Sequence, residues 1–256
     1  MKIEEKAPSR HSSKEEGVPF DFKHHDSLPP PLGTGWACAL FDMDGVLYDS
    51  MPLHTVAWIE AMSKFGIRMT AHDSYMTEGQ RGVDTIRQMV CQQQGRDITE
   101  QEAQAMYDEK ARLFHLMPEA PIIDGVIDLM QMFKSDGLQI CIVTGSAQRP
   151  LISRLTRDFG AFVDEEHIVT AYDVAHGKPA PEPYLKGLQK AGCAHPEQGI
   201  VIENAPMGIR AGVAAGCFTI AVNSGPLPDE VLLAEKPNLL FHSIRELCDK
   251  LKTYNS

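Results

Sequence analysis

The sequence predicts an α/β fold with a doubly wound parallel sheet and a small all-helical cap domain inserted after the first strand. Short apolar runs alternate with helical patterns along most of the chain, and this alternation is typical of a parallel sheet with helices on both faces. Between the first apolar run and the second, over residues 52–116, only helical patterns occur. An insertion at this point would lie above the carboxyl edge of the sheet, where ligands bind in such folds.

The expected strands are short apolar runs, each of a length that suits a buried strand. The first reads ACALF and the second reads QICIV, and three later runs have the same character. A sixth, shorter run is a further candidate. The complete set of expected strands is 37–41, 139–143, 167–169, 199–202, 218–222 and 239–241.

One expected helix of the core shows its buried face directly. Between residues 124 and 136, apolar side chains recur at the i, i+3, i+4 and i+7 positions of a helix, which is the spacing of a face that packs on a sheet. Gly137 then supplies a stop signal. The four apolar positions are Val126, Leu129, Met130 and Phe133.

Three helices are expected in the cap, over residues 53–65, 83–94 and 100–116. The last has a clear start, because Thr99 is followed three residues later by Glu102. This pair predicts a capping box, in which each side chain accepts a hydrogen bond from a backbone amide of the other residue.

Composition places the domain boundaries. The 256 residues, 43% of them hydrophobic, suit one large domain or one domain with an insert. Residues 1–34 are polar and end in three prolines and two nearby glycines, so we expect a disordered N-terminal tail. The expected core domain comprises residues 35–51 and 117–256, and the expected cap comprises residues 52–116.

Charge and cysteine content exclude several classes of protein. The formal net charge of −11 would repel a phosphate polymer, so a nucleic-acid partner is not expected. No 18-residue apolar run and no apolar leader segment occur, so neither a membrane span nor a secretory signal is expected. The six cysteines form no C-x-x-C pair, which favours reduced thiols and a cytoplasmic location.

The end of the first expected strand carries the chemistry. Asp42 and Asp44 follow a buried strand, and two carboxylates at such a place are costly without a partner. A hard dication is the natural partner. With that cation bound, Asp42 can be ligand and nucleophile, and Asp44 can be a general acid and base. Gly45 permits the sharp turn that leaves the site.

Two further residues could handle a phosphoryl group. Thr144, at a strand end before Gly145, can donate its hydroxyl to a phosphoryl oxygen, although a plain turn would look the same. Lys178, held extended by Pro179, can neutralise both Asp42 and the phosphoryl group. At about 4 Å and an effective dielectric of about 20, one pair of like charges costs roughly 4 kcal/mol. Considered alone, a single lysine in a proline-rich loop indicates a surface residue, and it is the place of Lys178 between the other motifs that favours the catalytic role.

These residues belong to a series of motifs that resembles the haloacid dehalogenase (HAD) superfamily of phosphohydrolases. F-D-M-D-G-V-L-Y-D-S at 41–50 is similar to the first motif, and V-T-G-S at 143–146, G-K-P-A-P-E-P-Y at 177–184 and V-I-E-N-A-P-M-G-I at 201–209 follow in order. The resemblance covers about residues 36–250. It implies a HAD-like Rossmannoid core, an aspartyl-phosphate intermediate, Mg²⁺, and substrate contacts from Gly145 and Ser146. The cap position resembles the β-phosphoglucomutase-like subgroup.

The fourth motif departs from the superfamily pattern, because Asn204 stands where such members commonly have Asp. An Asn carbonyl oxygen can still bind magnesium, and Glu203 could assist through a water. Asn204 is also a good N-cap, with Pro206 in the first helical turn, so a purely structural role stays open.

A second departure lies in the cap. A plain alignment places Glu78 where β-phosphoglucomutases have a lysine, and Gly82 where they have an arginine. An acid facing the pocket would repel a distal phosphate unless it bound the metal, so we expect Glu78 to coordinate magnesium on cap closure. The combination with Asn204 resembles the inorganic pyrophosphatase branch. The alternative is a solvated loop acid. Arg81 could anchor a second phosphoryl group, whereas Arg87 suits a helix surface.

His54 matches a histidine that orients the general acid in related mutases, although a histidine packed at the hinge would look similar. The resemblance thus implies Mg²⁺ held by Asp42, the backbone carbonyl of Asp44, Asn204 and Glu78, with a small phosphorylated substrate. Inorganic pyrophosphate is our first expectation. The alternatives are a sugar-phosphate phosphatase or β-phosphoglucomutase, and, from another class, a non-catalytic phosphometabolite-binding protein.

Overall fold

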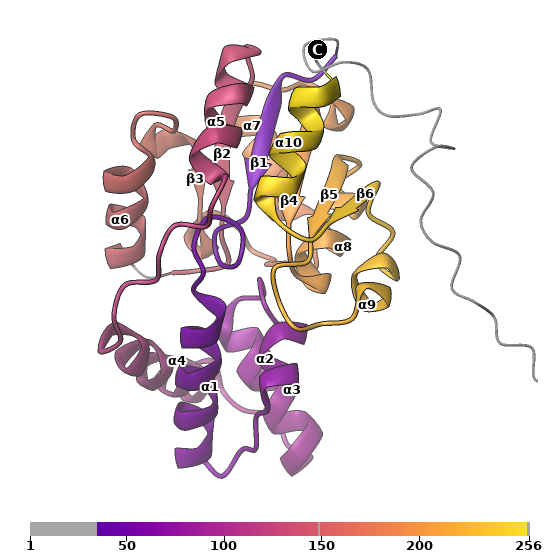
Figure 1. Ribbon diagram of the computed structural model, residues 1–256. Helices are drawn as coiled ribbons and strands as arrows, with labels where there is room; N and C mark the ends of the chain where they lie inside the picture. Colours follow the sequence, from indigo (N-terminus) through magenta and orange to yellow (C-terminus); the bar gives the residue numbers. More distant parts are fainter. Residues whose placement is uncertain (1–34, 148, 255–256) are drawn as a thin grey trace, which may run out of the picture. The chain divides into compact units, whose positions relative to one another are not determined.

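Six strands form one parallel sheet in the order β3-β2-β1-β4-β5-β6, as shown in Figure 1. The computed structural model describes residues 35–147 and 149–254, without the side chains of residues 149 and 254. The predicted α/β fold with a helical insertion after the first strand is confirmed. The strands are β1 (Cys38–Phe41), β2 (Gln139–Val143), β3 (Ile168–Val169), β4 (Gly199–Glu203), β5 (Phe218–Val222) and β6 (Leu239–Phe241).

Three predicted strand ends were wrong by one residue. The first strand begins at Cys38 rather than at residue 37, and β4 continues to Glu203. His167 does not join β3, because it ends a short 3₁₀ helix, η1 (Glu165–His167). Such errors are expected, since strand ends depend on pairing with a neighbour and not on apolarity alone.

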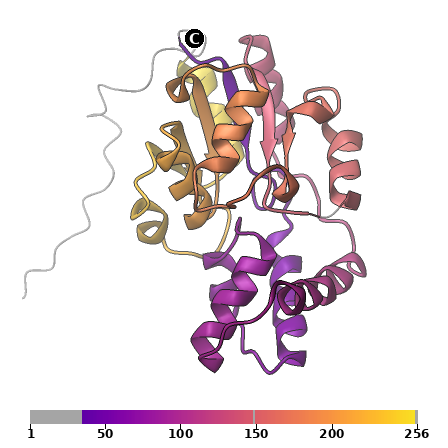
Figure 2. The ribbon, with the colours of Figure 1, turned by 180° about the vertical axis from the view of Figure 1, so that it is seen from behind.

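The sheet is covered on both faces, which is why its strands are apolar throughout rather than alternating. One set of strand residues, including Ala39, Phe41 and Ile142, packs with α5, α6 and α10. The other set, including Leu40 and Val143, packs with α7 and α8. Figures 1 and 2 show these two helix layers from opposite sides. The helices are α5 (Val126–Ser135), α6 (Arg149–Phe159), α7 (Glu182–Lys190), α8 (Pro206–Ala214) and α10 (Ile244–Tyr254).

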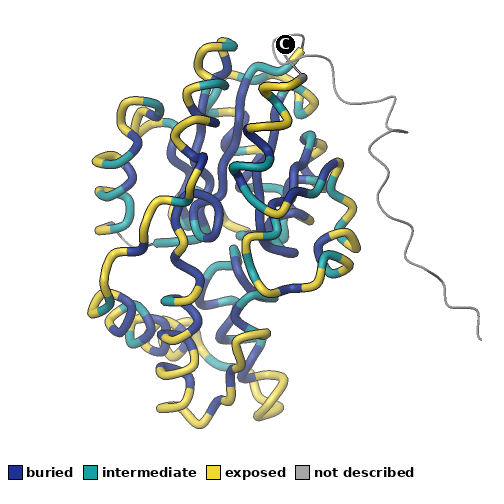
Figure 3. Tube along the Cα trace, viewed as in Figure 1, coloured by how far each residue is buried: buried dark blue, intermediate teal, exposed yellow. Residues whose placement is uncertain are grey.

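The insertion after β1 consists of helices only. Its members are α1 (Met51–Lys64), α2 (Ala71–Met76), α3 (Gly82–Gln94) and α4 (Glu100–His115). They enclose an apolar cluster of their own, in which Trp58, Met62, Ile86 and Met106 are buried, and Figure 3 shows buried positions on each of the longer cap helices.

The start of α4 was predicted correctly. Thr99 and Glu102 form the expected capping box, with the Thr99 amide 2.9 Å from the Glu102 carboxylate and the Glu102 amide 3.2 Å from the Thr99 hydroxyl. Helix α2 was missed, because only six residues carry it. Its start is marked by a second capping box, between Thr70 and Asp73.

Three short helices complete the described part of the core: α9 (Asp229–Leu233), η2 (Ala171–Asp173) and η3 (Pro196–Gln198). The cap and the core together form one compact unit. We therefore keep the boundary between them as a proposal, with residues 52–116 as the cap and residues 35–51 and 117–256 as the core. The tail predicted over residues 1–34 lies outside the described residues. Within the described residues, no helix is long and apolar enough to cross a membrane.

Candidate active site

The carboxyl ends of the central strands bring the predicted residues together. Asp42 follows β1, Thr144 follows β2, and Asn204 follows β4, and β1 is hydrogen-bonded to both of its neighbours. Parallel strands all end at the same edge, so residues far apart in the chain meet there. A pocket lies at this edge. Its core side is lined by Asp42, Asp44, Thr144, Gly145 and Ser146, and its cap side by Met51, His54, Trp58, Ser74, Thr77, Glu78, Gly79, Gln80, Gly82, Thr85, Tyr107 and Lys110.

The Lys178 ammonium group is the centre of a buried charge cluster. Its Nζ atom donates to the Asp42 carboxylate, to Glu203 Oε1 at 2.6 Å and to the Val143 carbonyl oxygen at 3.0 Å. Burial alone would lower the pKa of Lys178, but Asp42 and Glu203 outweigh burial and raise it above its ordinary value. Lys178 therefore stays a cation beside the Asp42 carboxylate.

Glu203 supports this lysine with both of its carboxylate oxygens occupied. Oε1 also accepts from the Tyr184 hydroxyl at 2.5 Å, and Oε2 accepts from the backbone amides of Asn204 at 3.0 Å and Ala205 at 3.3 Å. Gly208 allows the close approach, because a Cβ there would lie 1.7 Å from Glu203 Oε1. These contacts suit a role in holding Lys178 and leave Glu203 little capacity for the metal contact that was expected.

Asp44 accepts hydrogen bonds on one carboxylate oxygen from two neighbours. The Ser50 hydroxyl lies 2.6 Å from Oδ1, and His54 Nε2 lies 3.0 Å from the same atom. On the other side of the ring, Lys110 Nζ lies 2.6 Å from His54 Nδ1. Because an ammonium group can only donate, Nδ1 accepts and Nε2 carries the proton that points to Asp44.

This chain of contacts sets the charge on Asp44. Burial by itself would raise the pKa of this carboxyl, but His54, Ser50 and Lys110 outweigh burial and lower it to about 2. The imidazole itself is held flat against the Phe114 ring, with centroids 4.0 Å apart and planes 7° apart. His54 thus lies where an orienting residue for Asp44 was expected.

Lys110 was missed from the sequence, although a signal was present. In the helix expected at 100–116, the position of Lys110 lies on the same stripe as the apolar residues Met106, Leu113 and Phe114. A lysine on a buried stripe needs a partner. In the structure it is 3% exposed, its ammonium group lies about 5 Å above the Trp58 and Phe114 rings, and burial lowers its pKa to about 8.

Glu78 enters the pocket from the cap loop after α2. It is 8% exposed, and both of its carboxylate oxygens lie 3.2 Å from Asn204 Nδ2. A solvated loop position, the alternative weighed for Glu78, does not agree with this burial. The N-cap alternative for Asn204 was also wrong, because the N-cap of α8 is Ala205 and no side-chain capping bond forms there.

The remaining predicted residues divide between pocket and surface. Thr144 Oγ1 accepts from the Ser146 amide at 3.0 Å, and both residues line the pocket with Gly145. Arg81 does not line it. Its guanidinium group is engaged with Asp84 at 2.7 and 2.9 Å, within the cap. The prediction of Arg81 as a phosphate anchor therefore finds no support in this arrangement.

The family is decided by comparison with known proteins. A model of the haloacid dehalogenase-like hydrolases matches residues 36–216. This chain belongs to that family. Hexitol phosphatase A of Escherichia coli (strain K12) is 31% identical over 214 residues, covering 81% of this chain and 91% of the relative. A phosphorylated carbohydrates phosphatase of Thermotoga maritima is 31% identical, covering 83% of this chain and 97% of the relative.

A solved structure places the hydrolase among β-phosphoglucomutase-like members of the family. This structure is of a Bacteroides vulgatus protein that is provisionally named a β-phosphoglucomutase. It is 45% identical to this chain, with a TM-score of 0.81, and the match covers 85% of this chain and 88% of that one. The hydrolase is thus a HAD-type phosphohydrolase, and the non-catalytic alternative is not supported.

The donor set of the hydrolase fits a hard dication. Burial and the neighbouring Glu203 and Asp44 raise the pKa of Asp42 against the opposing effect of Lys178, and burial, then Asp42 and Asp44, raise the pKa of Glu78. Asn204 Oδ1 is buried without a hydrogen-bond partner. Carboxylate and amide oxygens in need of a cation are what Mg²⁺ binds.

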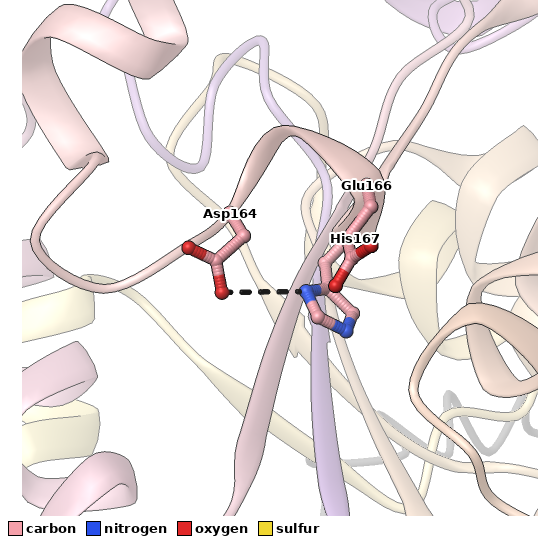
Figure 4. Close-up of side chains that lie close together, drawn as sticks. All are labelled: Asp164, Glu166 and His167. Atoms are coloured by element: carbon pink, nitrogen blue, oxygen red, sulfur yellow. Dashed lines mark ion pairs between the residues drawn. The ribbon is translucent and has the colours of Figure 1, made fainter.

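A second group of potential ligands lies outside the pocket, in η1 and the residue that precedes it. One ligand atom each of Asp164, Glu166 and His167 lies within 4.8 Å of the others (Figure 4). His167 Nδ1 is 3.9 Å from Asp164 Oδ2, and the Asp164 side chain is 77% exposed. The group stands at the amino end of β3, whereas the catalytic residues stand at the carboxyl ends of the strands, so it is not part of the active site.

Proposed function

We propose that the hydrolase transfers a phosphoryl group from a small substrate to Asp42 and then to water. The observation that carries this proposal is the paired arrangement of the two aspartates. The Asp42 carboxylate is held by the Lys178 ammonium group, and Asp44 is held by Ser50 and His54, with both carboxyls lining one pocket. A nucleophile and a separate acid and base are what covalent phosphoryl transfer requires.

The reaction proceeds in two displacements. In the first, an Asp42 carboxylate oxygen attacks phosphorus in line and the bond from phosphorus to the leaving oxygen breaks. The leaving oxygen takes a proton from Asp44, which must first acquire it from the substrate or solvent, because its lowered pKa leaves Asp44 ionised in the free protein. In the second, Asp44 takes a proton from water, the water oxygen attacks phosphorus, and the bond to Asp42 breaks. Lys178 offsets the repulsion between nucleophile and phosphoryl group in both steps, and Thr144 can donate its hydroxyl to a phosphoryl oxygen.

The residues that would hold Mg²⁺ are Asp42, the backbone carbonyl of Asp44, Asn204 and Glu78. When bound, Mg²⁺ neutralises charge on the transferring phosphoryl group. We assign Glu203 to the support of Lys178 rather than to the metal, because hydrogen bonds from Lys178, Tyr184 and two backbone amides occupy its oxygens.

Inorganic pyrophosphate is our first candidate substrate, and Glu78 supports it. This acid lies buried beside Asn204, with Asp42 and Asp44 close enough to raise its pKa. A carboxylate at that place takes space and charge that a bulky distal phosphate would need, whereas a metal-bound pyrophosphate needs little room. The combination of Glu78 and Asn204 resembles the pyrophosphatase branch of the family.

A second candidate has support from the relatives. The two named above are phosphatases of a hexitol phosphate and of phosphorylated carbohydrates, and the solved structure reported above carries a mutase name. Hydrolysis of a sugar or polyol phosphate would keep every residue of the core site. The two candidate reactions would differ only in the leaving group that the cap accepts. Neither of the two relatives is named for pyrophosphate.

One screen tests these proposals. Phosphate release is measured with pyrophosphate, glycerol phosphate, hexitol phosphate and hexose phosphates, at graded Mg²⁺ concentrations and with chelator. Release that requires Mg²⁺ and disappears in Asp42→Asn supports the proposed chemistry, and release that persists in this variant overturns it. A preference for pyrophosphate over every phosphomonoester supports the first candidate, and the reverse preference supports the second.

A further inference from the structure

Tyr184, in the first turn of α7, is a buried titratable residue that the proposed chemical steps do not use. Its side chain is fully buried, and its hydroxyl donates to Glu203 Oε1 at 2.5 Å. Its ring lies beside the Lys178 ammonium group, with Nζ 4.9 Å from the ring centroid. Burial and the charge of Glu203 raise the pKa of Tyr184 well above its ordinary value, so the hydroxyl keeps the proton that it donates.

One carboxylate oxygen receives both donors. Glu203 Oε1 accepts from Lys178 Nζ at 2.6 Å and from the Tyr184 hydroxyl at 2.5 Å. Lys178 and Tyr184 come from one short segment, the loop before α7 and the first turn of that helix, whereas Glu203 ends β4. A hydrogen bond to a carboxylate stabilises its charged form and makes it a weaker base. The hydroxyl of Tyr184 therefore weakens the hold of Glu203 on Lys178.

Lys178 has no spare hydrogen in this arrangement. An ammonium group has three N–H donors, and Lys178 directs them to Asp42, to Glu203 and to the Val143 carbonyl oxygen. The position of Nζ is thus a balance between two carboxylates, only one of which attacks phosphorus in the proposed reaction. Because Tyr184 weakens the contact with Glu203, it shifts this balance toward Asp42.

Packing does not require the hydroxyl. The Tyr184 ring belongs to the buried cluster formed by one face of the sheet with α7 and α8, where its neighbours include Leu188 and Val201. Phenylalanine would fill the same space. It would, however, leave Lys178 as the only donor to Glu203 Oε1, and the full charge of that oxygen would then attract the ammonium group.

We propose that Tyr184 is a positioning residue for the nucleophile: its hydroxyl takes up part of the charge of Glu203, so that Lys178 is held on Asp42. Tyr184 acts through Glu203 and Lys178, and it does not line the pocket. The inference rests on the proposed function, in which Asp42 attacks phosphorus, and adds to it a residue from outside the pocket.

The test is Tyr184→Phe, which keeps the ring and removes the hydroxyl. Phosphate release is measured with the substrate that the wild type prefers. We expect kcat to fall by about tenfold, the scale of one hydrogen bond to a charged group. KM should stay nearly unchanged, because Tyr184 does not touch the substrate, and this pattern indicates an interaction that acts in the transition state.

A double-mutant cycle separates this role from a general loss of structure. Glu203→Gln removes the charge that Tyr184 shares with Lys178. Adding Tyr184→Phe to Glu203→Gln should therefore cost no further activity, so that the double variant is about as active as Glu203→Gln alone. Independent roles for the two residues would give additive effects instead.

Tyr48 offers a matched control. It is 2% exposed, its hydroxyl also donates to a carboxylate, that of Asp158 at 2.9 Å, and it does not line the pocket. Tyr48→Phe should lose unfolding free energy, as Tyr184→Phe does, but keep the wild-type kcat.

Three results overturn the proposal: a folded Tyr184→Phe with the wild-type kcat, a fall in kcat that follows the loss of stability in both phenylalanine variants, or additive effects of Tyr184→Phe and Glu203→Gln. Wild-type protein without Asp42-dependent turnover would instead overturn the proposed function.

Discussion

The Glu78 carboxylate, in the cap, lies 3.2 Å from the side-chain amide nitrogen of Asn204, in the core. The contact joins residues 126 positions apart and is buried. It links the cap to the edge of the sheet at which we propose that Mg²⁺ binds, where the amide oxygen of the same asparagine is buried without a partner. We therefore expect the position of the cap and the binding of Mg²⁺ to be coupled through this pair of side chains.

The first prediction concerns this pair. Replacing Glu78 by Ala should weaken Mg²⁺ binding and lower pyrophosphate turnover by at least about 10–100-fold, the loss that removing even an outer partner of a metal ligand causes. Calorimetric Mg²⁺ titration and phosphate release measure the two effects. Glu60→Ala is the matched control, since Glu60 lies on the cap with a side chain that is 52% exposed. Unchanged Mg²⁺ affinity in Glu78→Ala would contradict the assigned role.

The second prediction concerns Lys178. Lys178→Met leaves the buried carboxyls of Asp42 and Glu203 without their cation, and breaking a buried pair on one side costs about 3–5 kcal/mol. We expect a fall of this size in the free energy of unfolding, measured with denaturant, together with loss of turnover. A double variant, Lys178→Met with Glu203→Gln, should regain part of the stability but none of the activity. If Lys178→Met alone were as stable as the wild type, Lys178 would not be stabilising the buried carboxyls of Asp42 and Glu203.

The third prediction concerns Lys110 and the pH dependence of turnover. Burial lowers the pKa of Lys110 to about 8, so the ammonium group that donates to His54 loses its proton as the pH rises through that value. Turnover should decline above pH 8 for this reason. In Lys110→Met, the rate should be lower than that of the wild type below pH 8, the two rates should converge above it, and the decline near pH 8 should vanish. A decline that is identical in the variant would assign it to another group.

The fourth prediction concerns stability at low pH. Asp158 accepts from Arg157 at 2.8 Å, from the Tyr48 hydroxyl at 2.9 Å and from Arg154 at 3.2 Å. Arg157, with Tyr48 and Arg154, lowers the pKa of Asp158 in the folded protein. A carboxyl with a depressed folded pKa contributes stability above its unfolded pKa of about 3.9 and loses it as the pH falls through the folded value.

Asp158→Asn should therefore be less stable than wild type at neutral pH. Below about pH 4 the difference in unfolding free energy should shrink steadily, because the wild-type carboxyl is then taking up its proton. Denaturant unfolding of both proteins at a series of pH values measures this difference in unfolding free energy. A difference that is constant from neutral to acidic pH would argue that the carboxylate charge is not what stabilises this cluster.

The fifth prediction compares two glycines where the cap loop meets the core. A Cβ on Gly145 would lie 2.4 Å from the backbone oxygen of Gly79, whereas one on Gly177 would meet the side chain of Arg81 at 2.6 Å. Backbone cannot rotate aside, but a side chain can. Gly145→Ala should therefore raise KM and lower kcat more strongly than Gly177→Ala, as steady-state kinetics would show. Equal effects would mean that the loop does not close on Gly145.

The strands and the order of the motifs could be read from the chain, because a buried strand in a two-layered parallel sheet is apolar along its whole length. That reading failed at strand ends such as His167 and at the six-residue helix α2, where pairing and tertiary contacts decide. Lys110 shows a different failure. Its position on an apolar stripe was visible, but the identity of its partner, His54, was not.

The sequence by itself determined the sheet, the cap and the two aspartates at the end of the first strand, because apolar periodicity and short motifs are local properties of the chain. Only the tertiary structure decided that Glu203 holds Lys178 and that Lys110 donates to His54. Each of these contacts joins residues from separate elements. Their distances depend on how the elements pack, which no local pattern contains.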